Sequence, residues 1–267
     1  INPASPNNLI CGNDGGIFET STGNAPWVKS YDLPITQFYA TNIDYLNPLR
    51  KIGGSQDNGS KITFTGGTNN WEVIYGGDGF TSHIDYTNSN IIYCTSQNGG
   101  LGRSTNNGVS FSDITAGLSG RFNWSTPYIL DNVNPSILYV GSNMLFRSTN
   151  RGTSWTAISG DLTRGPNGRL GTITCITSAA LGGGERVIYT GTDDAKISVT
   201  TNSGVNWTDV TGILPQRYVT DVRCDSRNPA IAYVTLSGFN IDENNTRIYR
   251  TTNYGANWSN ISGNLLN

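Results

Sequence analysis

The sequence is poor in several residue types, and each shortage excludes a class of protein. It has one His, one Met and four Lys among 267 residues, and only 13% of the residues are charged, against about a quarter in an average protein. With 17 basic and 19 acidic residues, the net charge is −2, so the chain has no basic footprint and nucleic acid is not an expected partner. No apolar stretch approaches the roughly 20 residues of a membrane span, so we expect no membrane insertion.

Cysteine and histidine are too few and too scattered for a metal centre. The four cysteines show no paired spacing and no nearby histidine cluster, and they are Cys11, Cys94, Cys175 and Cys224. They fall at matching places in different repeats, which are rarely close enough for the disulfide Cα separation of about 4.4–6.8 Å. We therefore predict buried free thiols in strands, a structural role for His83, and no metal or cofactor.

Glycine, Asn, Ser and Thr take the place of the missing charged residues. The chain contains 33 Gly, and this composition favours many short strands joined by tight turns over long helices.

One eight-residue pattern occurs four times, at Ser104–Phe111, Ser148–Trp155, Thr200–Trp207 and Thr251–Trp258. Each copy begins with Ser or Thr, has Asn third and Gly fifth, and ends in an aromatic residue; we call it the box. The terminal aromatics lie 44, 52 and 51 residues apart, the period of a propeller blade or a solenoid turn.

A second signature precedes the box in the fuller units. It is an apolar residue and Asp followed by Asn-Pro and an apolar strand, as at Asp131 to Asn134-Pro135 and Asp225 to Asn228-Pro229. Asn-Pro marks a turn between two strands. In the last unit, we predict strands at Val219–Cys224, Ile231–Leu236, Arg247–Thr251 and Trp258–Ile261.

Two weaker boxes end at Trp27 and Trp71, which makes six units. The predicted fold is an all-β propeller of four-stranded antiparallel blades, the first of them incomplete. The predicted blades of a single domain over 1–267 are 1–34, 35–76, 77–119, 120–165, 166–214 and 215–267. We expect the chain to be part of a longer one.

The box has a structural explanation in the residue types that it uses. Glycine supplies the positive φ of a tight turn, Ser, Thr and Asn side chains can bind turn amides, and the aromatic residue can pack between sheets. The predicted scaffold residues are Ser104, Asn106, Gly108, Phe111, Ser148, Asn150, Gly152, Trp155, Thr200, Asn202, Gly204, Trp207, Thr251, Asn253, Gly255 and Trp258.

The box resembles the Asp-box, or BNR repeat, of β-propellers, with Asn where that family usually has Asp. The resemblance covers nearly the whole chain and implies that the box joins the third and fourth strands of each blade, away from the ligand face. The segment Gln56–Gly59, followed by Gly76–Phe80 after Trp71, resembles secreted BNR-repeat proteins of sortilin type, which implies an extracellular or cell-surface protein.

Function is then expected on the loops at the opposite ends of the strands, which differ from blade to blade. Their carboxylates, amides and aromatic rings suit a glycan or an extracellular protein. The candidate ligand-binding residues are Asp57, Arg121, Trp124, Tyr218 and Phe239.

A further resemblance, to xyloglucanase-type glycosidases, offers an alternative. A catalytic Asp of that family stands two residues before a Gly-Gly in the first blade. This chain has Asn13 at that position, and the nearest carboxylate, Asp14, is shifted by one residue. Asp78 lies in a segment similar to the one that contains the family's second catalytic Asp. An amide cannot act as a base, and a glycosidase needs two facing carboxyls about 5–9.5 Å apart. We therefore predict a non-catalytic binding or structural module, with a glycosidase of xyloglucanase or sialidase type, using Asp14 or Asp78, as the alternative.

Overall fold

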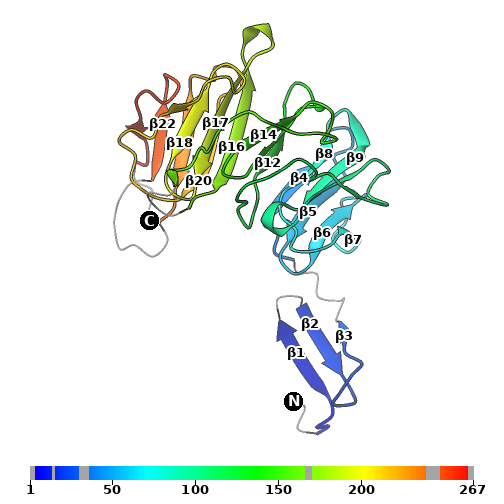
Figure 1. Ribbon diagram of the computed structural model, residues 1–267. Helices are drawn as coiled ribbons and strands as arrows, with labels where there is room; N and C mark the ends of the chain where they lie inside the picture. Colours follow the sequence, from blue (N-terminus) through cyan, green and yellow to red (C-terminus); the bar gives the residue numbers. More distant parts are fainter. Residues whose placement is uncertain (1–3, 14–15, 30–35, 166–169, 239–246, 264–267) are drawn as a thin grey trace. The chain divides into compact units, whose positions relative to one another are not determined.

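The computed structural model describes residues 4–13, 16–29, 36–165, 170–238 and 247–263 (Figure 1). Within these ranges the chain consists of short strands, and helix is confined to 3-10 turns such as Gln97–Gly99 and Gly182–Gly184. The prediction of an all-β fold is confirmed. Contacts divide the chain into two compact units, of which the first comprises 1–96 and 104–111 and the second 97–103 and 112–267.

Each repeat forms one antiparallel sheet from strands that are consecutive in sequence. The first sheet has three strands, β1 (Leu9–Asn13), β2 (Gly16–Thr20) and β3 (Val28–Lys29). The second has four, β4 (Ala40–Ile43), β5 (Lys51–Ser55), β6 (Gly59–Thr63) and β7 (Glu72–Tyr75). The third consists of β8 (Ser82–Asp85), β9 (Asn88–Thr95), β10 (Leu101–Ser104) and β11 (Ser112–Asp113).

The remaining three sheets belong to the second unit. The fourth contains β12 (Tyr128–Leu130), β13 (Leu138–Gly141), β14 (Leu145–Ser148) and β15 (Thr156–Ala157). The fifth contains β16 (Ile173–Ala180), β17 (Arg186–Thr192), β18 (Ile197–Thr200) and β19 (Thr208–Asp209). The sixth contains β20 (Val219–Cys224), β21 (Ala232–Leu236), β22 (Ile248–Thr251) and β23 (Ser259–Asn260). The four strands predicted for the last unit are therefore confirmed, with ends that differ by at most one residue.

Apolar side chains fill the space between neighbouring sheets of the second unit. Tyr189 and Val199 of the fifth sheet pack with Val222, Val234 and Trp258 of the sixth in one buried cluster. Strand β17 is buried along its whole length, because sheets cover both of its faces. In the first unit, a separate cluster joins the isoleucines of β5 and β6 to those of β8 and β9.

The box turns share one set of hydrogen bonds. In the copy that begins at Ser148, the hydroxyl oxygen accepts the N–H of Asn150 at 3.2 Å and of Gly152 at 2.8 Å. The Asn150 side-chain oxygen accepts the N–H of Ser154 at 2.9 Å. The other three copies make the same bonds within about 0.2 Å. The backbone N–H groups of the turn are therefore bonded to side-chain oxygens of the box, and not to the backbone of a paired strand.

The residue before the box glycine also has a left-handed backbone. Asn107, Arg151, Ser203 and Tyr254 have φ between 58° and 65°. Each donates its N–H to a carbonyl within two residues of the start of the second strand of its own sheet; for Arg151 the acceptor is Ser136 O at 2.9 Å. The box pattern does not predict this conformation, because left-handed φ is uncommon for residues such as Arg and Tyr.

Each box tryptophan of the second unit is hydrogen-bonded to the sheet that precedes its own. The indole Nε1 of Trp155, Trp207 and Trp258 donates to the carbonyls of Ile114, Ile158 and Val210 at 2.7, 2.8 and 2.7 Å. These acceptors all lie three residues after the previous box aromatic. The box thus joins one sheet to the previous one as well as closing its own hairpin.

The Asp and Asn-Pro signature forms the turn between the first two strands of a sheet. Asp131 Oδ1 accepts the N–H groups of Val133 and Asn134, both at 2.9 Å, and Asp225 makes the equivalent pair of bonds. Asp131 is fully buried and pairs with Arg186 of the next sheet, whose Nε and Nη2 lie 2.5 and 3.0 Å from its two oxygens. Burial acts to raise the pKa of Asp131, but the bonds from Arg186, Asn134 and Val133 outweigh it and lower the pKa.

The cysteines are free thiols in strands, as predicted, but their burial differs. Cys94 and Cys175 are buried, and burial raises the pKa of each thiol to about 12. Cys224 is half-buried and Cys11 is exposed, so the prediction of burial is wrong for Cys11. It lies on β1, where four of the five residues are exposed, because the three-stranded sheet has little packed against it in the described residues.

Candidate functional site

The two ends of the strands differ in character within the second unit. The box turns and the Asp and Asn-Pro turns lie at one end, which we call the box rim. The turns between the second and third strands and the connections between sheets lie at the other end. We call this end the loop face, formed by residues 120–127, 142–144, 159–165, 170–172, 193–196, 213–218 and 237–238.

Arg121, a predicted ligand-binding residue, holds three segments of the loop face together. Its Nη2 donates to Asp161 Oδ2 at 3.0 Å and to Thr163 Oγ1 at 3.3 Å. Its Nε donates to the Gly171 carbonyl at 3.2 Å. The side chain is 34% exposed, so the guanidinium lies at the surface with its Nε and Nη2 donors already engaged.

Asp161, which the sequence analysis did not select, lies at the centre of this network. Its carboxylate also accepts bonds from the Thr163 hydroxyl at 2.6 Å, the Thr163 N–H at 2.9 Å and Asn143 Nδ2 at 2.9 Å. Partial burial acts to raise its pKa, but the bonds from Thr163, Arg121 and Asn143 outweigh it and bring the pKa to about 2. Asp161 is therefore a fixed carboxylate and not a proton donor near neutral pH.

Asp193 and Asp194 bind the backbone of neighbouring segments. Asp193 accepts the N–H and hydroxyl of Thr172 at 2.7 and 3.0 Å. Asp194 accepts the N–H of Arg164 at 2.7 Å and the hydroxyl of Thr192 at 2.5 Å. These carboxylates hold loops in place, in the way that Asp side chains commonly order turns.

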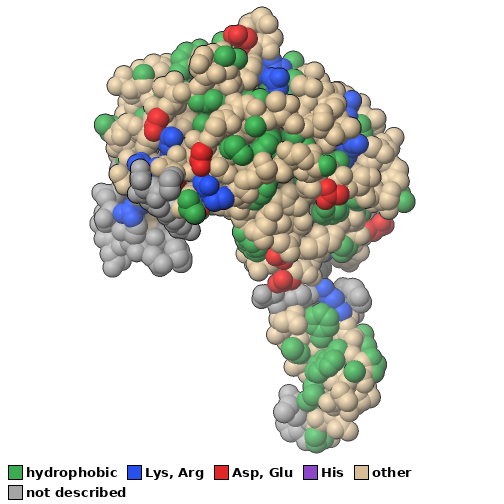
Figure 2. Space-filling view, in the orientation of Figure 1, with side chains coloured by type: hydrophobic (Ala, Val, Ile, Leu, Met, Phe, Trp, Pro, Cys, Tyr) green, Lys and Arg blue, Asp and Glu red, His purple; other side chains and the backbone are tan. Residues whose placement is uncertain are grey.

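The basic side chains of the loop face are similarly engaged. Arg164 donates from Nε and Nη2 to the carbonyls of Asp194 and Ala195 at 2.8 and 3.1 Å, and Lys196 Nζ donates to the Thr163 carbonyl at 3.1 Å. Figure 2 shows basic and acidic side chains singly or in small groups among polar and apolar ones on the face in view. On the loop face, Arg121 therefore pairs with the Asp161 carboxylate, whereas Arg164 and Lys196 are bonded to backbone carbonyls.

Two predicted aromatic residues remain at the surface of the loop face. Trp124 is 42% and Tyr218 40% exposed. Their backbones are fixed, because the Trp124 carbonyl accepts the Asn98 N–H at 3.1 Å and the Tyr218 carbonyl accepts the Ser237 N–H at 2.9 Å. The third predicted aromatic, Phe239, lies outside the described residues.

In the first unit, the structure brings Asp57 and Asp78 together. The Asp57 N–H donates to Asp78 Oδ1 at 2.9 Å, which joins the β5–β6 turn to the segment after β7. Asp57 has φ 57°, so its position is that of a left-handed turn residue. Beside it, the rings of Tyr39 and Phe80 stack with centroids 5.4 Å apart, a pair that the sequence analysis did not select. Asp14, the other carboxylate of the glycosidase alternative, lies outside the described residues.

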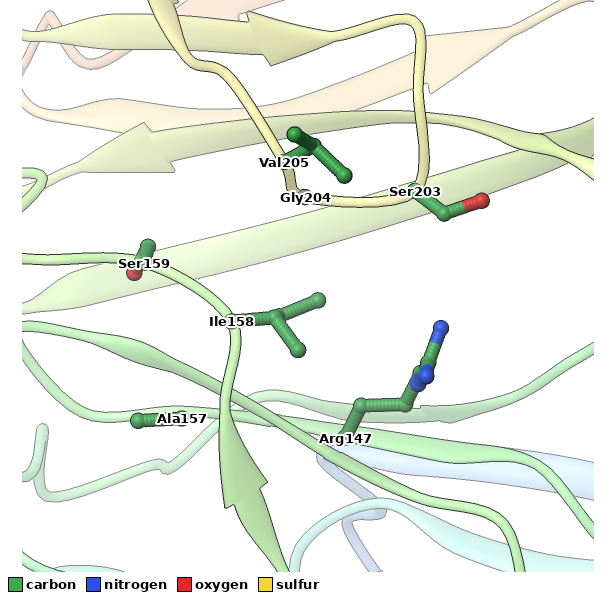
Figure 3. Close-up of a pocket in the computed structure, with 7 residues that line it drawn as sticks. All are labelled: Arg147, Ala157, Ile158, Ser159, Ser203, Gly204 and Val205. Atoms are coloured by element: carbon green, nitrogen blue, oxygen red, sulfur yellow. The ribbon is translucent and has the colours of Figure 1, made fainter.

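A shallow hollow of about 480 Å³ lies between the fourth sheet and the box turn of the fifth (Figure 3). Its lining residues are Arg147, Ala157, Ile158, Ser159, Ser203, Gly204 and Val205. Because a box turn forms one wall, the hollow belongs to the junction between two blades, and none of the predicted ligand residues lines it.

Neither a metal centre nor a spanning helix is found in the parts of the chain that the structure describes. No group of three or more His, Cys, Asp or Glu side chains could hold an ion there. No helix among the same residues is long and apolar enough to cross a membrane.

No family model and no curated protein matches the chain, but solved structures resemble it. The GH74 xyloglucanase from Xanthomonas campestris has a TM-score of 0.63 and 14% identity, and the match covers 97% of this chain and 44% of the enzyme. YCF48 from Cyanidioschyzon merolae has a TM-score of 0.58 and 14% identity, over 97% of this chain and 82% of that one. An auxiliary nutrient binding protein from Bacteroides thetaiotaomicron has a TM-score of 0.51 and 12% identity, over 88% and 64%.

These identities are too low to transfer an activity, and the chain spans less than half of the GH74 enzymes that it matches. They do show the fold, which agrees with the successive antiparallel sheets, one for each repeat. The chain therefore has the β-propeller fold, and its described residues form five four-stranded blades and one of three strands.

Proposed function

We propose that the chain is a non-catalytic binding module of a secreted or cell-surface protein, and that it holds a neutral carbohydrate on the loop face of its second unit. One observation carries the proposal: the loop-face carboxylates Asp161, Asp193 and Asp194 are engaged in bonds that fix the loops, whereas Trp124 and Tyr218 expose their rings. Amphipathic rings on rigid backbones are suited to binding the apolar faces of sugars.

The chemistry favours binding over hydrolysis. A glycosidase needs a carboxylic acid that is protonated near neutral pH beside a second carboxylate. Asp161 has the opposite property, since its pKa is about 2. A neutral sugar is favoured over an acidic one because Arg121, Arg164 and Lys196 are already bonded to acceptors of the loops.

The structural neighbours are compatible with this proposal. One is a nutrient binding protein and another is a xyloglucanase, so the same fold is used for both binding and hydrolysis. The proposal assigns binding to this chain on the basis of its own side chains.

Binding is tested by calorimetric titration of the chain with xyloglucan, β-glucans and sialylated glycans. We expect a neutral glucan to bind and Trp124→Ala to weaken its affinity by at least about tenfold, as for an aromatic hot spot. Tyr45→Ala is the matched control, because Tyr45 is 76% exposed but lies on a turn of the first unit. Equal losses in both variants, or no binding of any glycan, would contradict the proposal.

Release of reducing ends from the same glycans tests the alternative. We expect none. Turnover that disappears in Asp78→Asn would instead identify a glycoside hydrolase.

A further inference from the structure

Three successive junctions between sheets are made by residues of the second unit. At each one, a box turn packs against the sheet before it. The residue that precedes the box Ser or Thr of that earlier sheet lies at the junction, and it is Arg103 on β10, Arg147 on β14 and Val199 on β18. The same strand position can therefore be compared three times within the chain.

The first and third junctions are filled by the protein itself. Arg103 Nη1 donates to the carbonyl of Arg151, the fourth box residue, at 2.6 Å and to Oγ1 of Thr153, the sixth, at 3.2 Å. At the third junction, Val199 is 4% exposed, and Tyr254, the fourth residue of the next box, packs against the apolar cluster that contains it. Hydrogen bonds therefore close one junction, and apolar packing closes the other.

The middle junction has neither arrangement. Its fourth box residue is Ser203, which is shorter than the residues at that position in the other two turns, and its sixth is Val205, which has no hydroxyl. The Arg147 guanidinium has no hydrogen-bond acceptor among the described residues. The hollow of about 480 Å³ lies here, and Figure 3 shows the Arg147 side chain extending from β14 toward the turn 203–205.

The charge of Arg147 is also without a partner in the part of the chain that the structure describes. Tyr139, which pairs with Arg147 across β13 and β14, lies within electrostatic reach of Arg147, Asp131 and Arg186. Of these three charges, Asp131 and Arg186 neutralise each other in the buried ion pair. A half-buried guanidinium that is left over in this way is suited to an external oxyanion, because its planar N–H groups match the two oxygens of a carboxylate.

Ser203 offers a second donor to the hollow. Its Oγ accepts the Arg186 N–H at 2.8 Å, so the position of the hydroxyl is fixed while its proton is left for a ligand. The remaining surface is largely apolar, with Ala157, Ile158 and Val205 among the lining residues. The Ile158 carbonyl is held by the Trp207 indole at 2.8 Å, so the two walls are joined before any ligand arrives.

We propose that this hollow binds a small organic carboxylate. The carboxylate accepts from the Arg147 guanidinium and the Ser203 hydroxyl, and the apolar body of the ligand lies against Ile158 and Val205. One cation beside apolar walls suits a singly charged acid with an apolar body better than phosphate or sulfate, which have no apolar surface. Neither Trp124 nor Tyr218 lines the hollow, so this site does not depend on the glycan proposal.

The test is a titration of the full chain with isovalerate, followed by NMR through the backbone amide signals of residues 203–205. We expect saturable shifts with isovalerate and none with isovaleramide, which has the same shape without the charge. Arg147→Gln should weaken the affinity by at least about tenfold. Val205→Thr should weaken it too, because it restores the hydroxyl that engages the arginine at the first junction.

Arg103→Gln is the matched control. It removes an arginine from the same strand position, but one that is already bonded to the next box turn, so the affinity for isovalerate should not change. The rest of the amide spectrum reports whether each variant is folded, and Val205→Thr, at a residue that is 78% exposed, keeps the test decisive if Arg147→Gln does not fold.

Three results would overturn the proposal. The first is the absence of saturable shifts with isovalerate, or equal shifts with isovaleramide. The second is an equal loss of affinity in Arg103→Gln and Arg147→Gln. The third is displacement of isovalerate by an equal concentration of inorganic sulfate, because the hollow would then bind any oxyanion and the apolar walls would have no part in recognition.

Discussion

The box rim and the loop face of the second unit are made by the same strands, yet they follow opposite rules. On the rim, the same side-chain bonds close the box turns of Ser148, Thr200 and Thr251. On the loop face, Arg121, Asp193 and Asp194 make bonds that differ from blade to blade in the described residues, and Asp161 adds bonds from Arg121 and Asn143 to the Asp-x-Thr bond that it shares with Asp113 and Asp209. Bonds that occur in every blade belong to the scaffold, because every blade needs them to fold. A network that occurs in one blade indicates a function specific to that blade. Changes on the rim should therefore cost stability, and changes on the loop face should mainly affect binding.

The largest effect is expected at a rim tryptophan. Trp258→Ala should lower the free energy of unfolding by roughly 3–5 kcal/mol, the cost of deleting a large buried aromatic, because Trp258 is 5% exposed. Trp258→Phe keeps most of the packing and should cost only about 1 kcal/mol for the lost indole bond. Urea unfolding measures both values, and equal losses in the two variants would show that packing is not the main contribution.

The buried ion pair on the rim comes next. Asp131→Asn should cost about 3 kcal/mol, because it leaves Arg186 buried without its counter-charge. Asp225→Asn is the matched control at the same turn position, where the side chain is exposed and Asn can still accept the turn amides; its effect should be much smaller. Thermal unfolding of both variants measures the stability that each one loses. If they lose the same stability, the turn and not the ion pair is responsible.

On the loop face, Asp161 should make a smaller, pH-dependent contribution. Its pKa of about 2 in the folded chain is below the value near 3.9 of an unfolded Asp. The stabilisation is therefore present above pH ~4 and is lost as the pH falls from there through about 2. Since the side chain is 37% exposed, we expect Asp161→Asn to cost less than about 1 kcal/mol at neutral pH. The difference between wild type and variant, followed by urea unfolding from neutral to acid pH, should shrink in that window; a difference that is constant with pH would contradict the assignment.

The smallest change in stability is expected for Trp124→Ala, at most about 1 kcal/mol, since the residue is 42% exposed. The same variant should show the largest loss of glycan affinity. Urea unfolding measures this change. If Trp124→Ala lowered the free energy of unfolding as much as Trp258→Ala does, the proposed distinction between the box rim and the loop face would be wrong.

Sequence reasoning succeeds where the cause is local. The alternation in Val219–Cys224 and the turn chemistry of Asn228-Pro229 predict the strands of the last blade, because neighbouring residues alone determine them. The domain boundaries and the roles of the predicted site residues remain predictions, since no observation decides them.

The features that the sequence does not predict depend on interactions between residues that are distant in sequence. Asp131 and Arg186 are 55 residues apart, and the sequence around either residue does not predict that they pair. Asp161 was missed although Asp-x-Thr occurs at 113–115, 161–163 and 209–211, where the Thr hydroxyl binds the Asp each time. That recurrence is the signal that could have identified it.

The indole bonds of the box all point backward along the chain. Trp155, Trp207 and Trp258 reach acceptors 41, 49 and 48 residues earlier, which is about one repeat and never more. During synthesis, the emergence of each new blade would therefore complete the one made just before it. Folding of the second unit would then proceed in one direction along the chain, with each new blade adding contacts only to the blade before it.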